Sequence, residues 1–497
     1  MMPTRLGCLI IAVLTMFMVA CSSTSSGKDD AGVDGLTDGD VELDGNGNDG
    51  GDMFDGADLI DGADLIDGAD LIDGADLIDG ADLIDGADLI DGGDDAEACS
   101  VELEAPVNRI WPVAGELFYL QLGLGGLSTG ESALVVGPDG TIMVIDVGAS
   151  SHDDDVRDML SEIVTQMNAG GGYANAPFSE TALDHIVLTH FHGDHVSGLE
   201  DLRDRIDING KIVHRGLVDI TDAANAGTIQ KTCEAVAALP GREAALCTGD
   251  EVAPCDPDLW VGSYPSSGCP GLDEGDLGQD GDSGPAYLHL GGGARVDFIG
   301  SDATMNGDRY EELVGPLHTE DSNGENARSI VGILSHGDFR LLFAGDLTGG
   351  PSDTDPVEPF FAERIGLVSD IDELGVDVLH ANHHGRNTSS TPPWIDRLLP
   401  NDGLNRNTVM GISTASANSP HAEALAVLLD NNRLRDGRGW TTLVGIIGAS
   451  HDLLINAQGG HIIISTINGG AAYQIQAIGP TGTILAAGAY HSVRVCR

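Results

Sequence analysis

The sequence predicts an α/β domain with a two-sheet core over residues 99–497, and three observations support this prediction. Short apolar runs bounded by turn residues recur along this region, which is typical of strands. Stretches with helical periodicity lie between them. The region is about 400 residues long, which is large for one domain but fits a single two-sheet core that carries insertions.

The first elements are predicted directly from these patterns. Residues 117–122, 132–136 and 141–146 read as strands. The Gly137-Pro138-Asp139-Gly140 turn makes the last two strands a hairpin. Residues 153–168 follow with the pattern of a helix.

A cluster of metal-binding residue types follows the next predicted strand, residues 182–188. His190, His192, Asp194 and His195 fall within six residues, just before the opening of another helix at 196–206. Imidazole and carboxylate together suit zinc, iron or manganese. In extended backbone the first two histidines point to one side, and a turn at Gly193 can bring the other two residues to a second ion. The alternative is an ordinary polar loop rich in histidine.

This loop resembles a known motif. His190-Phe191-His192-Gly193-Asp194-His195 matches the HxHxDH signature of the metallo-β-lactamase superfamily, whose members are mostly binuclear metal hydrolases. The resemblance implies a four-layer αββα sandwich. Asp146-Val147-Gly148 resembles the first motif of the same superfamily, in which the aspartate supports the metal loop and does not ligate.

Three later blocks resemble the soluble hydrolase domain of ComEC-type DNA-uptake proteins and their exported relatives. They are an Asn-x-x-Ser strand (Asn326, Ser329), a Leu-x-x-Gly-Asp strand end (Asp346) and a His-His-Gly loop (His383, His384). His421 resembles a later histidine of that family, although proline precedes it here where it usually follows. The resemblance spans residues 117–473 without 217–286, and no membrane-channel segment accompanies it.

The resemblance implies two metal sites. His190 and His192 would hold the first ion, Asp194 and His195 the second, and Asp346 would bridge them. One of His383 and His384, with His384 taken as the ligand, would complete the second site, since adjacent residues on extended chain point opposite ways. Asp194, His383 and His384 are the residues expected to take part in catalysis, with Asp146, Asn326, Ser329 and His421 supporting them.

Two divalent ions, zinc first and manganese or iron as alternatives, suit hydrolysis of a phosphoester or an activated acyl bond with hydroxide as the nucleophile. The expected substrate is a small-molecule or envelope-derived phosphoester. An exported nuclease of ComEC-like type and an inactive surface binding protein with the same fold are the alternatives.

The N-terminus predicts export. Residues 1–20 carry Arg5 followed by an apolar run that is too short for a comfortable membrane span and has the shape of a signal peptide. Met18-Val19-Ala20-Cys21 resembles a bacterial lipobox, so Cys21 is the expected lipidation site. Plain secretion is the alternative. Either way the mature protein is expected outside the cytoplasm, and any contact with the membrane is expected through the lipid anchor alone.

Residues 21–98 contain the hexapeptide Asp-Gly-Ala-Asp-Leu-Ile six times without variation, from Asp55 to Ile90. A hexapeptide β-helix or a calcium-binding roll is one interpretation. Six short repeats give about two coils, and stacked repeats need about three units with caps. A disordered, self-repelling acidic spacer is therefore favoured.

Cysteine usage agrees with an oxidising compartment. Six cysteines remain beyond Cys8 and Cys21, and they allow fifteen pairings; they are Cys99, Cys233, Cys247, Cys255, Cys269 and Cys496. Four of them lie in residues 217–286, a Gly-, Pro- and Asp-rich stretch. We interpret this stretch as a disulfide-bearing insertion that shapes substrate access.

The charge argues against a nucleic acid substrate. The chain has 80 acidic and 23 basic residues, a net charge of −57. Residues 22–98 hold 25 acidic residues and one lysine, and residues 1–21 hold one arginine, which leaves −34 for residues 99–497. A domain with this balance repels a polyanion unless a local basic patch overcomes it.

Overall fold

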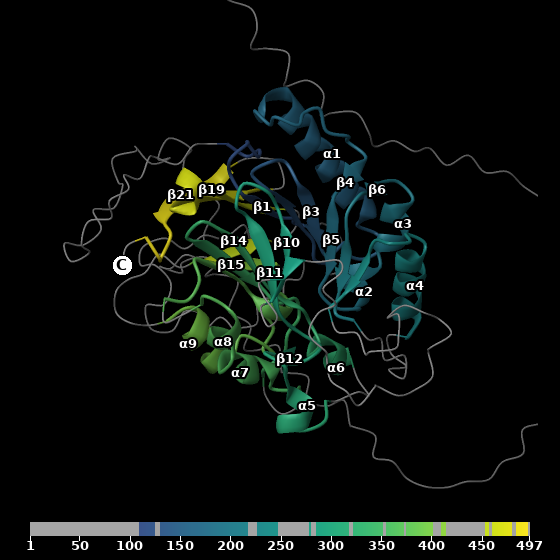
Figure 1. Cartoon of the computed structure of the whole chain (residues 1–497), viewed down its shortest axis with the longest axis vertical. Coiled ribbons are helices and arrows are strands. Elements are labelled where there is room, and N and C mark those ends of the chain that lie inside the picture. The colour runs from purple at the N-terminus through teal and green to yellow at the C-terminus, as the bar shows by residue number, and fades with distance from the viewer. Residues whose placement is uncertain are drawn as a thin grey trace, which may run out of the picture. The chain divides into compact units, whose positions relative to one another are not determined.

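The computed structural model describes residues 109–124, 130–216, 226–246, 278–279, 285–317, 322–350, 354–371, 374–400, 409–413, 453–456, 460–479 and 484–495 (Figure 1). All of them belong to one compact unit, Ile84–Arg497. The predicted signal peptide, Cys21, the acidic repeats and His421 lie outside the described residues.

The first sheet mixes antiparallel and parallel pairing. Its strands, in sheet order, are β21 (Ile484–His491), β20 (Ala472–Ile478), β19 (His461–Ile467), β1 (Phe118–Gln121), β2 (Ala133–Val136), β3 (Ile142–Ile145), β5 (His185–Leu188), β7 (Ile212–His214) and β8 (Glu243–Ala245). The predicted hairpin is confirmed, because β2 and β3 pair antiparallel. From β3 to β8 the pairing is parallel, so the carboxyl ends of β3 and β5 lie at the same edge.

The second sheet comes from the later part of the chain. Its strands run in the order β13 (Asp308–Arg309), β12 (Thr304–Met305), β11 (Arg295–Ser301), β14 (Val331–His336), β15 (Phe339–Phe343), β16 (Val378–His380), β17 (Val409–Ser413) and β18 (Leu453–Asn456), with β10 (Ala286–His289) and β9 (Gly278–Gln279) added beside β11. The pairs from β15 to β18 are parallel. A further pair, β4 (Ala182–Leu183) and β6 (Asp207–Ile208), stands apart.

The two sheets face each other across a shared apolar core. Residues of the first sheet such as Val135 and Met143 belong to the same buried cluster as Leu334 and Leu341 of the second. Because side chains alternate along a strand, the opposite face of each sheet is free to pack against helices.

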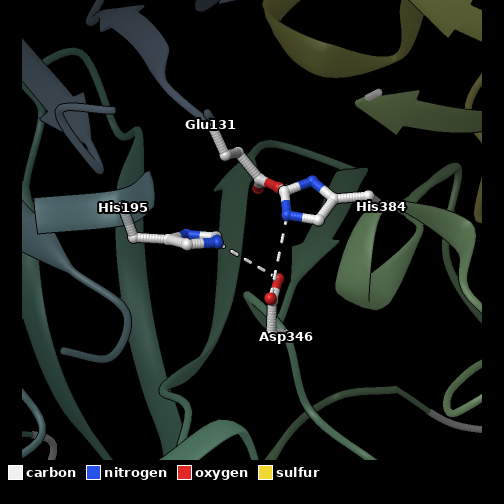
Figure 2. A group of neighbouring side chains, drawn as sticks. All are labelled: Glu131, His195, Asp346 and His384. Atoms are coloured by element: carbon white, nitrogen blue, oxygen red, sulfur yellow. Dashed lines mark ion pairs between the residues drawn. The ribbon is translucent and has the colours of Figure 1, made fainter. Parts of the chain in front are cut away.

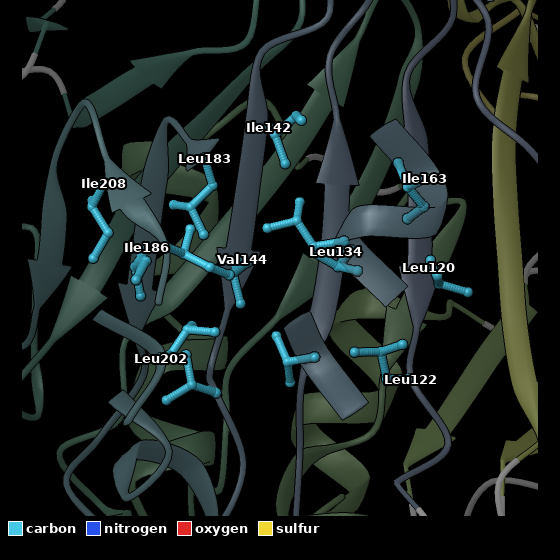
Figure 3. Close-up of a cluster of buried hydrophobic side chains, with 14 of the residues drawn as sticks. Leu120, Leu122, Leu134, Ile142, Val144, Ile163, Leu183, Ile186, Leu202 and Ile208 are labelled. Atoms are coloured by element: carbon cyan, nitrogen blue, oxygen red, sulfur yellow. The ribbon is translucent and has the colours of Figure 1, made fainter. Parts of the chain in front are cut away.

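Helices cover the outer face of the first sheet. They are α1 (Asp153–Gly170), α2 (Gly193–Val196), α3 (Leu199–Arg203) and α4 (Ala226–Ala237). Leu160 and Ile163 of α1 lie in one buried cluster with Leu134 and Val144 of the sheet. Figure 3 shows Ile163, Leu134 and Val144 in this cluster. The predicted helix at 153–168 is confirmed, whereas the one at 196–206 is shorter and broken between α2 and α3.

Helices also cover the outer face of the second sheet. They are α5 (Tyr310–Leu313), α7 (Val357–Ala362), α8 (Ile365–Val368) and α9 (Pro392–Leu398), while α6 (Ser322–Asn326) lies in the segment before β14. Phe361 of α7 and Trp394 of α9 share a buried cluster with Ile333 and Leu342. The described residues therefore form helix, sheet, sheet and helix layers, which agrees with the predicted mixed α/β sandwich.

Part of the predicted insertion 217–286 belongs to the core. β8 pairs in parallel with β7, and the buried Val236 of α4 joins the cluster under the first sheet. The Gly- and Asp-rich composition of the whole stretch hid this short amphipathic helix. Cys233 is buried in α4 as a free thiol, so the expected disulfide-bearing insertion is not supported. The other five cysteines of the predicted framework lie outside the described residues.

Within the described part of the chain, none of the helices is long and apolar enough to cross a membrane.

Candidate metal centre

The histidine-rich loop leaves the edge of the first sheet at the end of β5. The N-terminal end of α2 follows His192 directly, and His192 itself is still extended, with φ −76° and ψ 151°. The extended segment sets His190 and His192 on the same side, with 3.0 Å between Nε2 of His190 and Nδ1 of His192. The helical turn then carries His195 to a different position. The geometry agrees with the alternation that the sequence predicts.

Asp346, just after β15, lies at the centre of the site. Its carboxylate is 3.8 Å from His190 Nε2 and 3.2 Å from His195 Nε2. Two groups of potential ligand atoms share this carboxylate: one contains His190, His192 and Asp346, and the other contains His195, Asp346, His384 and Glu131. In each group the ligand atoms lie within 4.8 Å of one another. The structure thus brings together the residues expected around a bridging aspartate.

The two adjacent histidines occupy a strained turn. His383 and His384 lie in the 3-10 segment η2 (Asn382–Gly385) and both have left-handed backbone angles, with φ of 49° and 53°. Left-handed backbone is uncommon for residues other than glycine and tends to occur at functional sites. Nε2 of His383 is 3.6 Å from Asp346 Oδ2, and Nε2 of His384 is 3.7 Å from the same atom.

The expectation that these two histidines point opposite ways is therefore wrong. It assumed extended backbone, and the left-handed turn brings both imidazoles to the same carboxylate. His384 belongs to the second ligand group, whereas Nδ1 of His383 is 2.6 Å from Thr388 Oγ1 and its Nε2 is 3.4 Å from Asn326 Nδ2. These two contacts orient His383 beside the centre.

Asp194 lies close to the second group. Its Oδ2 is 3.5 Å from His384 Nε2, and its side chain is 26% exposed, the most open of the carboxylates around the centre. Its backbone carbonyl accepts a hydrogen bond from Glu131 N. The second ligand group contains Glu131 and does not contain Asp194. Asp194 therefore lies beside the second ligand group and is more exposed to solvent than the carboxylates in that group.

Glu131 is the member of the site that the sequence did not reveal. It lies two residues before the start of β2, is 5% exposed, and lies beside the ring of His384 (Figure 2). Oε2 is 3.4 Å from His384 Nδ1, and Oε1 is 3.4 Å from His380 Nε2. Burial raises the pKa of Glu131 to about 8, although His195 and His384 oppose the shift. One signal could have identified it: a glutamate next to Gly130, immediately before a strand of the same sheet as the histidine loop.

Asp146 supports the loop from the end of β3. It has a left-handed φ of 54° and lies fully buried. Oδ1 accepts the Thr189 N–H at 2.8 Å, and Oδ2 accepts the Thr189 hydroxyl and lies 2.8 Å from His195 Nδ1. Asp146 therefore contacts the imidazole of His195 on the side away from Asp346.

Asn326 and Ser329 lie next to the centre but outside the ligand groups. Asn326 ends α6, and Ser329 is buried under Gly345, where an added Cβ would come within 3.3 Å of Ser329 Oγ. The predicted Asn-x-x-Ser strand begins only at Val331, so Asn326 and Ser329 lie in the segment that joins α6 to β14.

A buried ion pair fixes the residue between the first two histidines. The N–H of Phe191 donates to Glu325 Oε1 at 2.8 Å, and Arg215 donates to both oxygens of Glu325 at 2.8 Å. The Arg215 guanidinium also lies 5.0 Å from the centre of the Phe191 ring. Since Glu325 is on α6, this network ties the histidine loop to an element next to the second sheet.

The electrostatics of the centre favour cations. Burial alone would lower the pKa of His195, but Asp346 and Asp146 outweigh it and raise that pKa well above its ordinary value. For His384, burial is likewise outweighed by Asp346 and Asp194, and the pKa rises to about 9. Burial would raise the pKa of Asp346, yet the nearby imidazoles lower it well below its usual range. The carboxylates thus draw positive charge into a buried site.

The donor set fits divalent metal ions. Buried atoms that form no hydrogen bond of ordinary geometry converge here from within the described residues: His195 Nε2, His384 Nε2 and Asp346 Oδ1. Buried polar atoms without partners are costly unless something satisfies them. Imidazole nitrogens with a shared carboxylate suit zinc, manganese or iron. Two such ions would share Asp346.

The comparisons with known proteins agree with this geometry. Residues 127–234, which include the histidine loop, match the family model described as the metallo-beta-lactamase superfamily. No curated protein matches the chain.

Several solved structures are distantly similar. A Cronobacter sakazakii metallo-β-lactamase with a HARLDQ motif shares 15% identity over 56% of this chain and 79% of its own, with a TM-score of 0.24. Zn²⁺-bound PqqB from Methylobacterium extorquens shares 13% sequence identity over 53% of this chain and 71% of its own, with a TM-score of 0.24. A long form RNase Z from yeast shares 11% sequence identity over 71% of this chain and 50% of its own, with a TM-score of 0.30. The family match thus covers residues 127–234, and the layered sheets described above agree with it.

Proposed function

We propose that the protein is an extracytoplasmic, metal-dependent hydrolase of phosphoesters, in which His190 and His192 hold one divalent ion, His195 and His384 hold another, and Asp346 contacts both. The observation that carries the proposal is the sharing of one buried carboxylate by two groups of ligand atoms. Two ions at such a site lower the pKa of water and stabilise negative charge on both the attacking and the leaving oxygen. Zinc is the first choice of metal, with manganese or iron as alternatives.

The side chains around the centre would have two roles: some orient the ligating histidines, and one would contact the substrate. Asp146 holds the Nδ1 side of His195, and Glu131 holds the Nδ1 side of His384, so both histidines present Nε2 to the centre. Such carboxylate contacts fix the orientation of a ligating imidazole and raise its basicity. His383, oriented by Thr388, is placed to bind a substrate oxygen or its proton.

The proposed location and substrate rest on the sequence. The signal-like residues 1–20 and the lipobox-like Cys21 support an exported, lipid-anchored protein of the cell envelope. The charge of −34 over residues 99–497 supports a small or envelope-derived phosphoester in preference to a nucleic acid. The acidic residues 21–98 would act as the spacer between anchor and domain.

The nuclease alternative rests on the Asn326, Asp346 and His384 blocks, which resemble ComEC-type domains. We would assay the mature protein with bis-p-nitrophenyl phosphate, a phosphocholine ester and single-stranded DNA, each with Zn²⁺ and Mn²⁺. The proposal expects cleavage of the small phosphoesters and loss of at least about 100-fold in His192→Ala. DNA cleavage that dominates at physiological salt would favour the nuclease, and full activity of His192→Ala would remove the catalytic assignment.

A further inference from the structure

An exposed arginine stands beside the metal centre. Arg386 follows η2 directly, two residues after His384, and its backbone N–H donates to the His383 carbonyl at 2.8 Å. Its side chain is exposed, whereas His383, His384 and Gly385 before it are buried. The positive charge of Arg386 also acts on His383, where it adds to the lowering of the pKa that burial begins. The chain therefore leaves the buried centre and reaches solvent at this guanidinium.

Arg386 differs from the other arginines of the described residues in having no side-chain partner. The others all donate to a carboxylate or a backbone carbonyl; they are Arg109, Arg157, Arg203, Arg205, Arg215, Arg242, Arg295, Arg309, Arg328, Arg340, Arg364, Arg397 and Arg494. In a chain with 80 acidic and 23 basic residues, carboxylates are abundant. Within the described residues the Arg386 guanidinium has no such carboxylate, so it is available to an external anion.

The carboxylates of the centre make the binding of an anion depend on nearby positive charge. The centre itself is rich in carboxylates, because Glu131, Asp194 and Asp346 all lie against His384. An anion that approaches it needs positive charge outside the metal positions, and Arg386 is two residues from His384. A guanidinium suits this task, since its planar donors match two phosphate oxygens at once.

We propose that Arg386 binds the anionic oxygens of the substrate and makes the enzyme select charged phosphoesters over neutral esters. This inference rests on the proposed phosphoesterase function. Arg386 is then a specificity-determining residue: it contacts a non-bridging oxygen, or a second anionic group of the substrate, while the metal ligands surround the reacting phosphorus.

The test compares two substrates with the same leaving group. Bis-p-nitrophenyl phosphate carries one negative charge, and diethyl p-nitrophenyl phosphate is neutral. In Arg386→Gln we expect kcat/KM for the charged diester to fall about 10- to 100-fold, mainly through KM, as for loss of a hydrogen bond to a charged group. The neutral triester should change less than about twofold, and Arg386→Lys should recover part of the loss because it keeps the charge. Arg157→Gln, on the surface of α1, is the matched control.

A binding measurement separates this inference from the proposed function. Inorganic phosphate is titrated into metal-loaded protein by calorimetry, and its Kd should rise about 10-fold in Arg386→Gln but not in Arg157→Gln. An unchanged Kd in Arg386→Gln, or equal losses on both substrates, would overturn the role of Arg386. If the wild type cleaves neither phosphoester, the proposed function fails, and the phosphate titration still decides whether Arg386 binds an anion.

Discussion

Glu131 contacts one ring nitrogen of His384 and Asp346 faces the other: Glu131 Oε2 is 3.4 Å from Nδ1, and Asp346 Oδ2 is 3.7 Å from Nε2. Asp146 contacts His195 at Nδ1, at 2.8 Å. Both histidines of the second ligand group thus have a carboxylate at Nδ1, and Glu131 is itself a member of that group. Figure 2 shows how Glu131 and Asp346 lie around the ring of His384.

Glu131→Gln should weaken the second metal site without removing it. A carboxylate that orients a ligating histidine typically contributes 10- to 100-fold in metal affinity, so we expect the weaker of two Zn²⁺ dissociation constants to rise by about that factor. Competition with a chelating dye measures it. Glu200→Gln, exposed on α3, is the control, and an unchanged affinity in Glu131→Gln would contradict the orienting role.

Glu358→Ala should loosen the loop that carries the two histidines. Glu358 is buried on α7; Oε1 accepts from Asn382 Nδ2 at 2.7 Å and from Ser390 N at 2.8 Å, and Oε2 accepts from Thr391 N at 2.8 Å. Removing it leaves several buried donors unsatisfied, and we expect a loss of about 2–4 kcal/mol in the free energy of unfolding. Urea denaturation measures this.

Glu363→Ala provides the comparison for that variant, because the Glu363 side chain is 79% exposed. It should change the free energy of unfolding by less than about 0.5 kcal/mol. Equal stability of the two variants would show that Glu358 does not hold the loop.

Asp377 should make stability depend on pH. Burial raises its pKa to about 7, against the lowering effect of the N–H groups of Val493 and Arg340 that donate to it. A carboxyl with a raised pKa binds a proton in the folded state that it has lost when unfolded, so its contribution is full below about pH 4 and is lost as the pH rises through about 7.

The measurement compares wild type with Asp377→Asn in chelator from pH 4 to pH 8. The stability of the wild type relative to the variant should fall with rising pH, by at most about 4 kcal/mol for a shift of this size. When the free energy of unfolding of the variant is subtracted from that of the wild type, the contributions of the other carboxylates cancel. A difference that stays constant or grows with pH would contradict the raised pKa.

The sequence predicted the elements whose signals are local. The β2–β3 hairpin follows from its Pro-Asp-Gly turn, and the loop from His190 to His195 follows from the density of ligand types behind a strand. Asp146 was identified because Asp146-Val147-Gly148 ends a predicted strand and resembles the first motif of the metallo-β-lactamase superfamily; that strand, β3, pairs in parallel with β5. These relations depend on residues close together in the chain.

The parts of the fold and of the site that the sequence did not predict depend on contacts between residues far apart in the chain. Glu131 becomes part of the site only because β2 lies two strands from β5, and no ligand-type residue directly beside it signals this. The left-handed turn at His383 and His384 has no glycine at either position, so the sequence favoured an extended chain. The pairing of β1 with β19, far apart in the chain, likewise leaves no local pattern.

The central claim is that Asp346 joins two metal sites. The most direct measurement is the number of Zn²⁺ ions bound per chain, by elemental analysis of protein dialysed against buffered zinc. We predict two ions in the wild type, one in His190→Ala, and fewer than one in Asp346→Asn, because both ligand groups lose their shared member. A wild type without bound metal, or Asp346→Asn with two ions still bound, would contradict the account.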